Sequence, residues 1–306
     1  MPGPRPLPLF LELVRQTAEK DPELASAALR GLAKVQQAPR SPRRQERREV
    51  ARVGAATLLD CGGSGQPIVL VPSLINPPDI LDLDRGTSLA EALAGSGHVV
   101  LLDWGPATAR QALSIGDHID ALLIPLLREL RQPAVLIGYC LGGTMALAAA
   151  SLTPTRGVVT LASPWRFSAY PPGAIASLKT LWNDARCTVD QLGVLPIEVL
   201  QAAFWSLDPR RTVDKFAQLA SLESDDPRLT RFIALEDWAN AGEPLPRPAA
   251  RELIEDLFAR DLPGTGEWKV GSRTIALLSL PMLHVTAAND RIVPEATVAP
   301  GPKLAC

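Results

Sequence analysis

Apolar runs alternate with helix-like segments along the middle of the chain. The runs cover residues 67–72 (PIVLVP), 98–104 (HVVLLDW), 133–140 (PAVLIGYC) and 157–163 (GVVTLAS). Runs of this length are typical of strands buried on both faces. Helical patterns over 88–97, 115–130 and 142–152 separate them, and Pro125 should kink the second. Strand and helix therefore alternate with short connections, which predicts an α/β fold with a mostly parallel sheet and helices on both faces.

The flanking segments suggest a division of the chain into four parts. Residues 1–52 have a helical, arginine-rich pattern and are expected to be a lead-in, and residues 53–163 the first part of the core. Residues 164–271 are rich in Trp, Phe and Pro without a clear buried strand, and we expect them to form a helical lid over the active site. The strand pattern resumes in 272–306, which we expect to continue the core in truncated form, with its last strand missing.

Composition and charge narrow the range of functions. The 306 residues are 46% hydrophobic and 21% charged, with a net charge of −2, so there is no general reason to expect a nucleic-acid partner. The 29 prolines predict many loops. The four cysteines are scattered, which argues against a disulfide framework or a metal site and favours the cytoplasm. We also expect neither a signal peptide nor a membrane-spanning segment.

One stretch, residues 40–52, is crowded with arginine. We expect it to be a solvated linker or an exposed helix face, and the alternative is a contact with a granule, a lipid or a partner. The arginines are Arg40, Arg43, Arg44, Arg47, Arg48 and Arg52.

The segment LIGYCLGGTMAL carries the strongest chemical signal. Cys140 lies between Gly138 and Gly142, with Gly143 next, after an apolar strand and before an alanine-rich helix. A nucleophile on a sharp strand-to-helix turn needs neighbours without side chains, because the backbone is strained and the helix packs closely. The N-terminus of a helix should also lower the pKa of the cysteine. We therefore predict that Cys140 is a nucleophile rather than a buried structural cysteine.

A nucleophile of this kind works with a carboxylate and a histidine, which follow it in that order in α/β-hydrolases. Asp290 lies just beyond the next sheet strand after the lid, where sites gather, and is our candidate; the alternative is a solvated loop aspartate. The three histidines are His98, His118 and His284, and none follows Asp290. We expect all three to be structural, with His284 packed in the sheet, so the catalytic histidine stays unknown.

An oxyanion hole would complete the site. The backbone N–H of Leu141, directly after the nucleophile, is one predicted donor. The loop after the 67–72 strand should supply the second, near Ser73 or Leu74, and we assign it to Leu74. Asp103 and Trp104 end a strand on the same side of the sheet, and they either shape the pocket or are structural.

With these residues identified, the chain resembles the polyhydroxyalkanoate synthases, especially those that work with a second, non-catalytic subunit. The resemblance runs from about Gln66 to Pro294 and is carried by IVLVPSLINPPDILDL, SLAEAL, GHVVLLDWG, GYCLGGT, DWANAGEPLP, ELIEDLF and ANDRIVP. It implies that Cys140 carries the growing acyl chain, that Asp290 is the triad carboxylate, and that the lid controls access of (R)-3-hydroxyacyl-CoA. The family places its histidine in a Gly-His turn shortly beyond the point where this sequence ends.

The resulting hypothesis is an acyltransferase that forms a polyester through a cysteine thioester and releases CoA. Two alternatives stay open. One is a cysteine hydrolase resembling dienelactone hydrolases, which carry a similar turn but are smaller and lack the lid. The other is a catalytically incomplete synthase paralogue or fragment. No cofactor or metal is expected, and the expected partners are the acyl-CoA substrate, a partner subunit, a second copy of the chain and a polymer granule surface in the cytoplasm.

Overall fold

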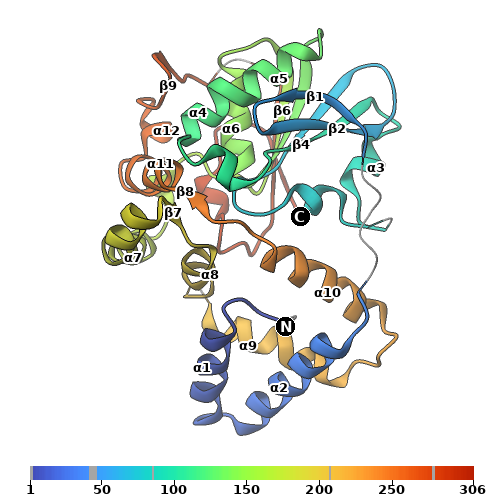
Figure 1. Cartoon of the computed structure of the whole chain (residues 1–306), viewed down its shortest axis with the longest axis vertical. Helices are drawn as coiled ribbons and strands as arrows, with labels where there is room; N and C mark the ends of the chain where they lie inside the picture. The colour runs from blue at the N-terminus through green and yellow to red at the C-terminus, as the bar shows by residue number, and fades with distance from the viewer. Residues whose placement is uncertain (1–2, 41–46, 85, 207, 278–279) are drawn as a thin grey trace. The chain divides into compact units, whose positions relative to one another are not determined.

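The structure is a computed structural model that describes residues 3–40, 47–84, 86–206, 208–277 and 280–306 (Figure 1). The chain forms two compact units, each built from two separate stretches of sequence. One unit contains residues 1–45 and 196–242, and the other contains residues 46–195 and 243–306. The second unit holds the large sheet and all the predicted site residues, so it is described first.

The centre of this unit is an eight-stranded sheet in the order β1-β2-β4-β3-β5-β6-β11-β12. Its strands are β1 (Glu49–Val53), β2 (Ala56–Gly62), β3 (Pro67–Val71), β4 (His98–Asp103), β5 (Ala134–Tyr139), β6 (Thr155–Leu161), β11 (Met282–Thr286) and β12 (Lys303–Ala305). The β1–β2 and β2–β4 pairs are antiparallel, and all the other pairs are parallel. This is the strand order of the α/β-hydrolase fold, and the predicted fold class is confirmed.

Side chains alternate across the sheet and are buried on both faces. On β3, Ile68 and Leu70 join one apolar cluster with Val99 and Leu101 of β4, against which α3 (Leu89–Leu93) packs. On the other face, the alternate residues of the same strands are fully buried as well. Helix α6 (Leu141–Ala150) packs on β5 and β6, and Figure 1 shows α5 and α6 beside the strands. Helices therefore cover both faces, as the continuous apolar runs predicted.

The expectation that the last strand is missing was wrong. Residues Lys303–Ala305 form β12, parallel to β11, with His284 opposite Lys303 and Thr286 opposite Ala305. The His284 N–H donates to the Pro302 carbonyl at 2.9 Å, and the Cys306 N–H donates to the Thr286 carbonyl at 2.8 Å. Three residues that follow Pro and Gly give no periodicity to recognise, so this strand depends on pairing with β11 and not on its own pattern.

The remaining helices of this unit connect and flank its strands. They are η1 (Pro78–Asp82), η2 (Ala107–Arg110), α4 (Ile115–Asp117), η3 (His118–Leu123), α5 (Ile124–Glu129), η4 (Phe167–Ala169), α7 (Pro172–Leu192), α11 (Arg247–Arg251), η6 (Glu252–Phe258), α12 (Leu262–Thr265) and η7 (Glu295–Thr297). Two-residue strands form the small pairs β7 (Val194–Leu195) with β8 (Leu245–Pro246), and β9 (Lys269–Val270) with β10 (Arg273–Thr274). The segment η3, just before Pro125, has π-helical hydrogen bonding. This fits the proline, which has no backbone N–H to donate.

The other unit is entirely helical in the part of the chain that the structure describes. It contains α1 (Leu7–Ala18), α2 (Pro22–Gln37), α8 (Ile197–Ser206), α9 (Pro209–Ala217), η5 (Gln218–Ser221) and α10 (Pro227–Asn240). Its core includes Phe10, Val35 and Phe216, all fully buried. A Cβ on Gly31 of α2 would lie 1.9 Å from the Phe216 carbonyl oxygen, so this glycine lets α2 approach α9 closely.

The predicted domain boundaries and the predicted arginine-rich surface are compared with the structure in turn. The residues of the predicted lid belong to both units, and the four-part division stays a prediction. Of the arginine-rich stretch, residues 41–46, which include Arg43 and Arg44, lie outside the described residues. The others form ion pairs within the chain: Arg40 with Asp237, Arg47 with Asp82, Arg48 with Asp60, and Arg52 with Glu49. No helix in the described residues combines the length and apolar character needed to span a bilayer.

Candidate active site

Cys140 occupies a strained turn between strand β5 and helix α6. Its backbone φ is 53° and its ψ is −127°, a conformation rarely adopted by residues other than glycine. The Cys140 N–H donates to the Leu161 carbonyl at 2.9 Å, and the Gly143 N–H donates to the Cys140 carbonyl at 2.9 Å. These bonds hold the turn from both sides, so the cysteine lies at the carboxyl end of the interior strand β5, on the strand-to-helix turn that the sequence predicted.

The three glycines of the turn are required by close backbone contacts. A Cβ on Gly138 would lie 2.3 Å from the Gly143 Cα, and one on Gly142 would lie 2.3 Å from the Val71 carbonyl oxygen and 2.4 Å from that of Pro72. A Cβ on Gly143 would lie 2.0 Å from the Ser163 Oγ. Such distances exclude any side chain, which is the physical reason for the glycines around Cys140.

The predicted lowering of the Cys140 pKa was wrong. The residue is half-buried, and burial raises the pKa of its thiol to about 11. The Leu141 backbone N–H lowers the pKa, but this smaller effect does not offset burial, and the negative charge of Asp290 raises it further. The thiol is therefore protonated at neutral pH in this structure.

Asp290 lies in the loop after β11, where the sequence placed the carboxylate. Its Oδ1 accepts hydrogen bonds from the backbone N–H groups of Ile292 at 2.8 Å and Val293 at 2.9 Å. The carboxylate is close enough to Cys140 to raise the pKa of the thiol. The structure thus brings Asp290 and Cys140 to the same region, at the carboxyl ends of the parallel strands.

The three histidines lie away from Cys140. His98 is paired with Asp60, with 3.3 Å between Nε2 and Oδ1. His118 is fully buried next to Arg110. His284 is fully buried in β11, with its Nδ1 2.7 Å from the Thr160 Oγ1. Each position is structural, and the sheet packing expected for His284 is what the structure shows.

The loop after β3 lies against the Cys140 turn. Ser73 and Leu74 are buried, and the close approach of Gly142 to the Pro72 carbonyl places this loop next to the start of α6. None of the hydrogen bonds found among the described residues uses the backbone N–H of Ser73 or of Leu74. Buried amides without an acceptor are rare, so these two amides stay candidates for the predicted oxyanion hole.

Two tyrosines adjoin the site that sequence analysis did not identify. The pKa values of Tyr139 and Tyr170 are raised by burial, and the charges of Cys140 and Asp290 add to the effect on both. The Tyr170 hydroxyl donates to the Ile292 carbonyl at 2.9 Å, within the loop that carries Asp290. Tyr139 stands in the motif itself, whereas nothing in the sequence around Tyr170 indicates its position.

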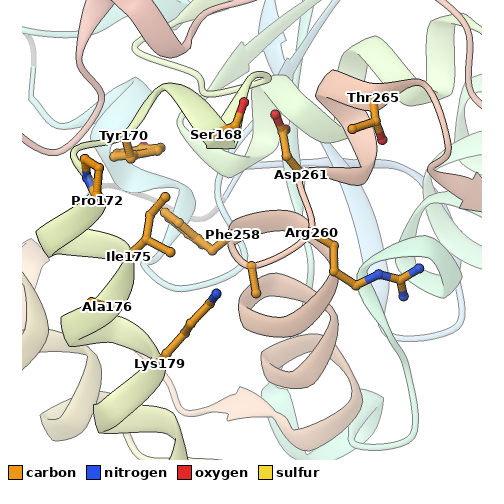
Figure 2. Close-up of a pocket in the computed structure, with 11 residues that line it drawn as sticks. Ser168, Tyr170, Pro172, Ile175, Ala176, Lys179, Phe258, Arg260, Asp261 and Thr265 are labelled. Atoms are coloured by element: carbon orange, nitrogen blue, oxygen red, sulfur yellow. The ribbon is translucent and has the colours of Figure 1, made fainter.

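Tyr170 also lines a cavity of about 460 Å³ between α7 and the segment from η6 to α12. Figure 2 shows Ile175 and Lys179 on α7 opposite Phe258, while the Arg260 side chain points away from Lys179. Cys140 does not line this cavity. Among the described residues, no three His, Cys, Asp or Glu side chains lie close enough together to hold a metal ion.

No family model matches the chain, and its curated relatives are mainly polymerase subunits. A poly(3-hydroxyalkanoate) polymerase subunit PhaC from Synechocystis sp. is 28% identical over 257 residues, which is 78% of this chain and 68% of that protein. The same subunit from Thiocystis violacea is 28% identical over 240 residues, 74% of this chain and 67% of that protein. A pimeloyl-[acyl-carrier protein] methyl ester esterase from Xanthomonas axonopodis pv. citri is 32% identical over 167 residues, 54% of this chain and 55% of that protein.

Solved structures similar to the chain include esterases and related proteins. Rv0554 from Mycobacterium tuberculosis is 17% identical, with a TM-score of 0.48, over 82% of this chain and 84% of that chain. A thermophilic esterase from Thermogutta terrifontis is 17% identical, with a TM-score of 0.41, over 83% of both chains. The fold assignment rests on the strand order and not on these similarities. The relatives found by sequence support a further conclusion: the chain is related to the polyhydroxyalkanoate synthase family.

Proposed function

We propose that the chain is a polyhydroxyalkanoate-synthase-like acyltransferase that uses Cys140 as its nucleophile and (R)-3-hydroxyacyl-CoA as its substrate. The observation that carries the proposal is the strained turn that presents Cys140 at the N-terminus of α6. The proximity of Asp290 and the buried amides of Ser73 and Leu74 support it. The sequence relatives, which are polymerase subunits, favour acyl transfer over other chemistry of this turn.

The proposed first step is a thioester exchange. The Cys140 Sγ attacks the acyl carbonyl, a new S–C bond forms, the S–C bond to CoA breaks, and CoA leaves as a thiol with the proton that Cys140 has lost. The two thiols have similar basicity, so the acyl group stays activated. In the second step the 3-hydroxyl oxygen of another acyl group attacks the Cys140 thioester. A new C–O bond forms, the C–S bond to Cys140 breaks, and the hydroxyl proton returns to the Cys140 sulfur. A lid over residues 164–271 would exclude the water that hydrolyses this intermediate.

The proposal requires a base, because a thiol with a pKa of about 11 is only about one part in 10⁴ ionised at pH 7. His98, His118 and His284 are held elsewhere in the fold. We propose that a histidine from outside this sequence takes the proton, with Asp290 as its orienting carboxylate. Without that histidine, the rate of acylation of Cys140 should rise about tenfold per pH unit up to pH 11.

The test is to incubate the chain with (R)-3-hydroxybutyryl-CoA between pH 7 and pH 10, and to measure free CoA and the intact mass. We expect one hydroxyacyl group on Cys140 and a rate that rises with pH. The Cys140→Ala variant should lose the adduct, whereas Cys61→Ala, which removes another buried thiol, should keep it. Absence of an adduct at every pH, or an adduct that survives Cys140→Ala, would falsify the proposal.

The second candidate is a cysteine hydrolase, favoured by the similarity to the Xanthomonas esterase. Its product from the same substrate would be free hydroxy acid, whereas the synthase would give oligomer, so product analysis separates them. A non-catalytic role makes a third, distinct prediction. In that case Cys140→Ala would leave the cellular effect of the protein unchanged.

The names of the relatives also support proposals about partners. Because those proteins are polymerase subunits, we propose that this chain works with a partner subunit or with a second copy of itself. A place at the surface of a cytoplasmic polymer granule follows from the same proposed function. Fractionation of polymer-accumulating cells should then recover the chain with the granules.

A further inference from the structure

The loop that follows β3 is held at both ends through its carbonyl groups. The Trp104 indole Nε1–H donates to the Pro72 carbonyl at 3.0 Å, and the Glu243 backbone N–H donates to the Ile75 carbonyl at 3.1 Å. The amides of Ser73 and Leu74 lie between these two points, and neither has an acceptor among the described residues. The loop is therefore held by hydrogen bonds to its carbonyl groups, while the N–H groups of Ser73 and Leu74 are left to donate to another acceptor.

The two donors are fixed in turn by a polar cluster around the buried Arg110 and the half-buried Glu243. The Glu243 carboxylate accepts from the Ala107 N–H at 2.6 Å and lies 3.6 Å from the Arg110 Nη2. Arg110 is only 4% exposed, and its Nε donates to the Gly105 carbonyl at 3.0 Å. Its Nη1 lies 3.2 Å from the His118 Nε2. Residues far apart in the sequence are thus joined into one network behind the loop.

His118 supports Trp104 from the other side. Burial lowers the pKa of His118 to about 4, and the Arg110 charge acts in the same direction, so the imidazole is neutral at pH 7. A neutral ring can accept from Arg110 at Nε2 while its Nδ1–H donates to the Ser114 carbonyl at 2.6 Å. The ring also meets the Trp104 indole edge-on, with 5.7 Å between centroids. The indole N–H is therefore held in its direction toward Pro72.

We propose that Trp104 and Glu243 are positioning residues, which hold the 72–75 loop so that the amides of Ser73 and Leu74 bind the acyl oxygen beside Cys140. The contact between Gly142 and the Pro72 carbonyl ties the loop to the turn that carries the thiol. The inference rests on the proposed function only in requiring that Cys140 is acylated. The amides contribute to acyl transfer because negative charge develops on the carbonyl oxygen as the thiolate attacks.

The test compares two reactions of Cys140, one that needs an oxyanion hole and one that does not. 4-Nitrophenyl acetate acylates the thiol through a tetrahedral oxyanion, whereas iodoacetamide alkylates it by displacement of iodide. In Trp104→Phe, which keeps an aromatic ring but removes the indole N–H, acylation should slow by about 10- to 100-fold, because a small misplacement of the donors is enough. Alkylation should be unchanged. Trp182→Phe is the matched control, since it removes a buried indole bond to Glu255 of 2.9 Å and should alter neither rate.

A second pair of variants tests Glu243. Glu243→Gln keeps an oxygen for the Ala107 N–H and should retain most of the acylation rate, whereas Glu243→Ala should slow acylation and not alkylation. Equal slowing of both reactions in Trp104→Phe would mean general distortion and would overturn the inference. So would a wild-type Cys140 that is alkylated but not acylated by the ester. Acylation by the ester but not by hydroxyacyl-CoA would instead overturn only the proposed function, and a thiol that reacts with neither reagent would overturn both.

Discussion

Cys61 and Cys140 are two thiols with the same pKa in very different surroundings. Burial raises the pKa of each to about 11. Cys61 lies within β2, 6% exposed, in the apolar cluster under α3. Cys140 lies on a turn with a positive φ, next to a helix N-terminus. The pKa therefore does not distinguish the thiol that we propose as the nucleophile from the one inside the sheet, whereas their backbone geometry differs.

The surroundings of Cys61 even contain the other residue types of a triad. Asp60 precedes Cys61 in β2, and its carboxylate is paired with His98 of β4. A bulge at Asp60–Gly62 interrupts the pairing of β2 with β4, and the Asp60 charge raises the pKa of the Cys61 thiol, so a carboxylate acts on this thiol as well. At Cys140 the carboxylate comes from a separate loop at the strand ends, which places it on the same side as the thiol. The backbone conformation of the cysteine, and not the residue types around it, separates the two regions.

The largest expected change in the free energy of unfolding is that of Gly142→Ala near Cys140, compared with Gly62→Ala next to Cys61. In Gly142→Ala the new Cβ would meet the backbone of Val71 and Pro72, which cannot move away, so we expect a loss of about 3 kcal/mol in the free energy of unfolding. In Gly62→Ala the Cβ meets nothing within 4 Å, and only the positive φ of 95° costs about 1 kcal/mol. Urea unfolding of both variants measures the difference. Equal losses would mean that the Cys140 turn is not tightly packed.

The raised pKa of Cys61 should make stability depend on pH. Because the folded pKa of about 11 lies above that of an unfolded thiol, the stabilisation is fully present below about pH 8.5 and is lost as the pH rises through 11. We expect about 2–3 kcal/mol of this loss to disappear in Cys61→Ala. Urea unfolding of wild type and variant at pH 8 and pH 11 gives the value as a difference, in which the other titrating groups cancel. An unchanged pH dependence in Cys61→Ala would contradict the prediction.

The smallest effect is expected at the His98–Asp60 pair. The two side chains are partly exposed, with 3.3 Å between Nε2 and Oδ1, so His98→Gln should change the free energy of unfolding by less than about 1 kcal/mol. It should leave the rate of alkylation of Cys140 by iodoacetamide unchanged. A slower alkylation in His98→Gln would show that this histidine acts on Cys140, and would undo the distinction between the two regions. Mass spectrometry of the alkylated protein measures both cysteines in one sample.

The sequence predicted the parts of the molecule that have local signals. Buried parallel strands appear as continuous apolar runs, and a nucleophile turn needs glycines at fixed positions, so β3 to β6 and the Cys140 turn could be predicted from short segments. Asp290 could be placed because its loop follows a recognisable strand. The short strand β12 could not, because three residues gain their structure only by pairing with β11.

The features that escaped prediction depend on residues far apart in the sequence. The Cys140 pKa is a sum of burial, a helix N-terminus and a carboxylate, and no pattern gives their relative size. Trp104, Arg110 and Glu243 meet only because β8 brings the segment that carries Glu243 beside η2. Tyr170 approaches the Asp290 loop by the same kind of long-range contact. Such arrangements follow from the complete fold and from no single segment.

The helical unit built from residues 1–45 and 196–242 has a consequence for synthesis of the protein. Phe10 and Val35 are made early, but Val213 and Phe216, which complete their core, leave the ribosome only after strands β1 to β6. At ordinary rates of translation this interval is roughly 10–40 s. Throughout it, the apolar face of α1 and α2 is open to water or to a chaperone, and these first helices must wait for one of the later segments before their unit can close.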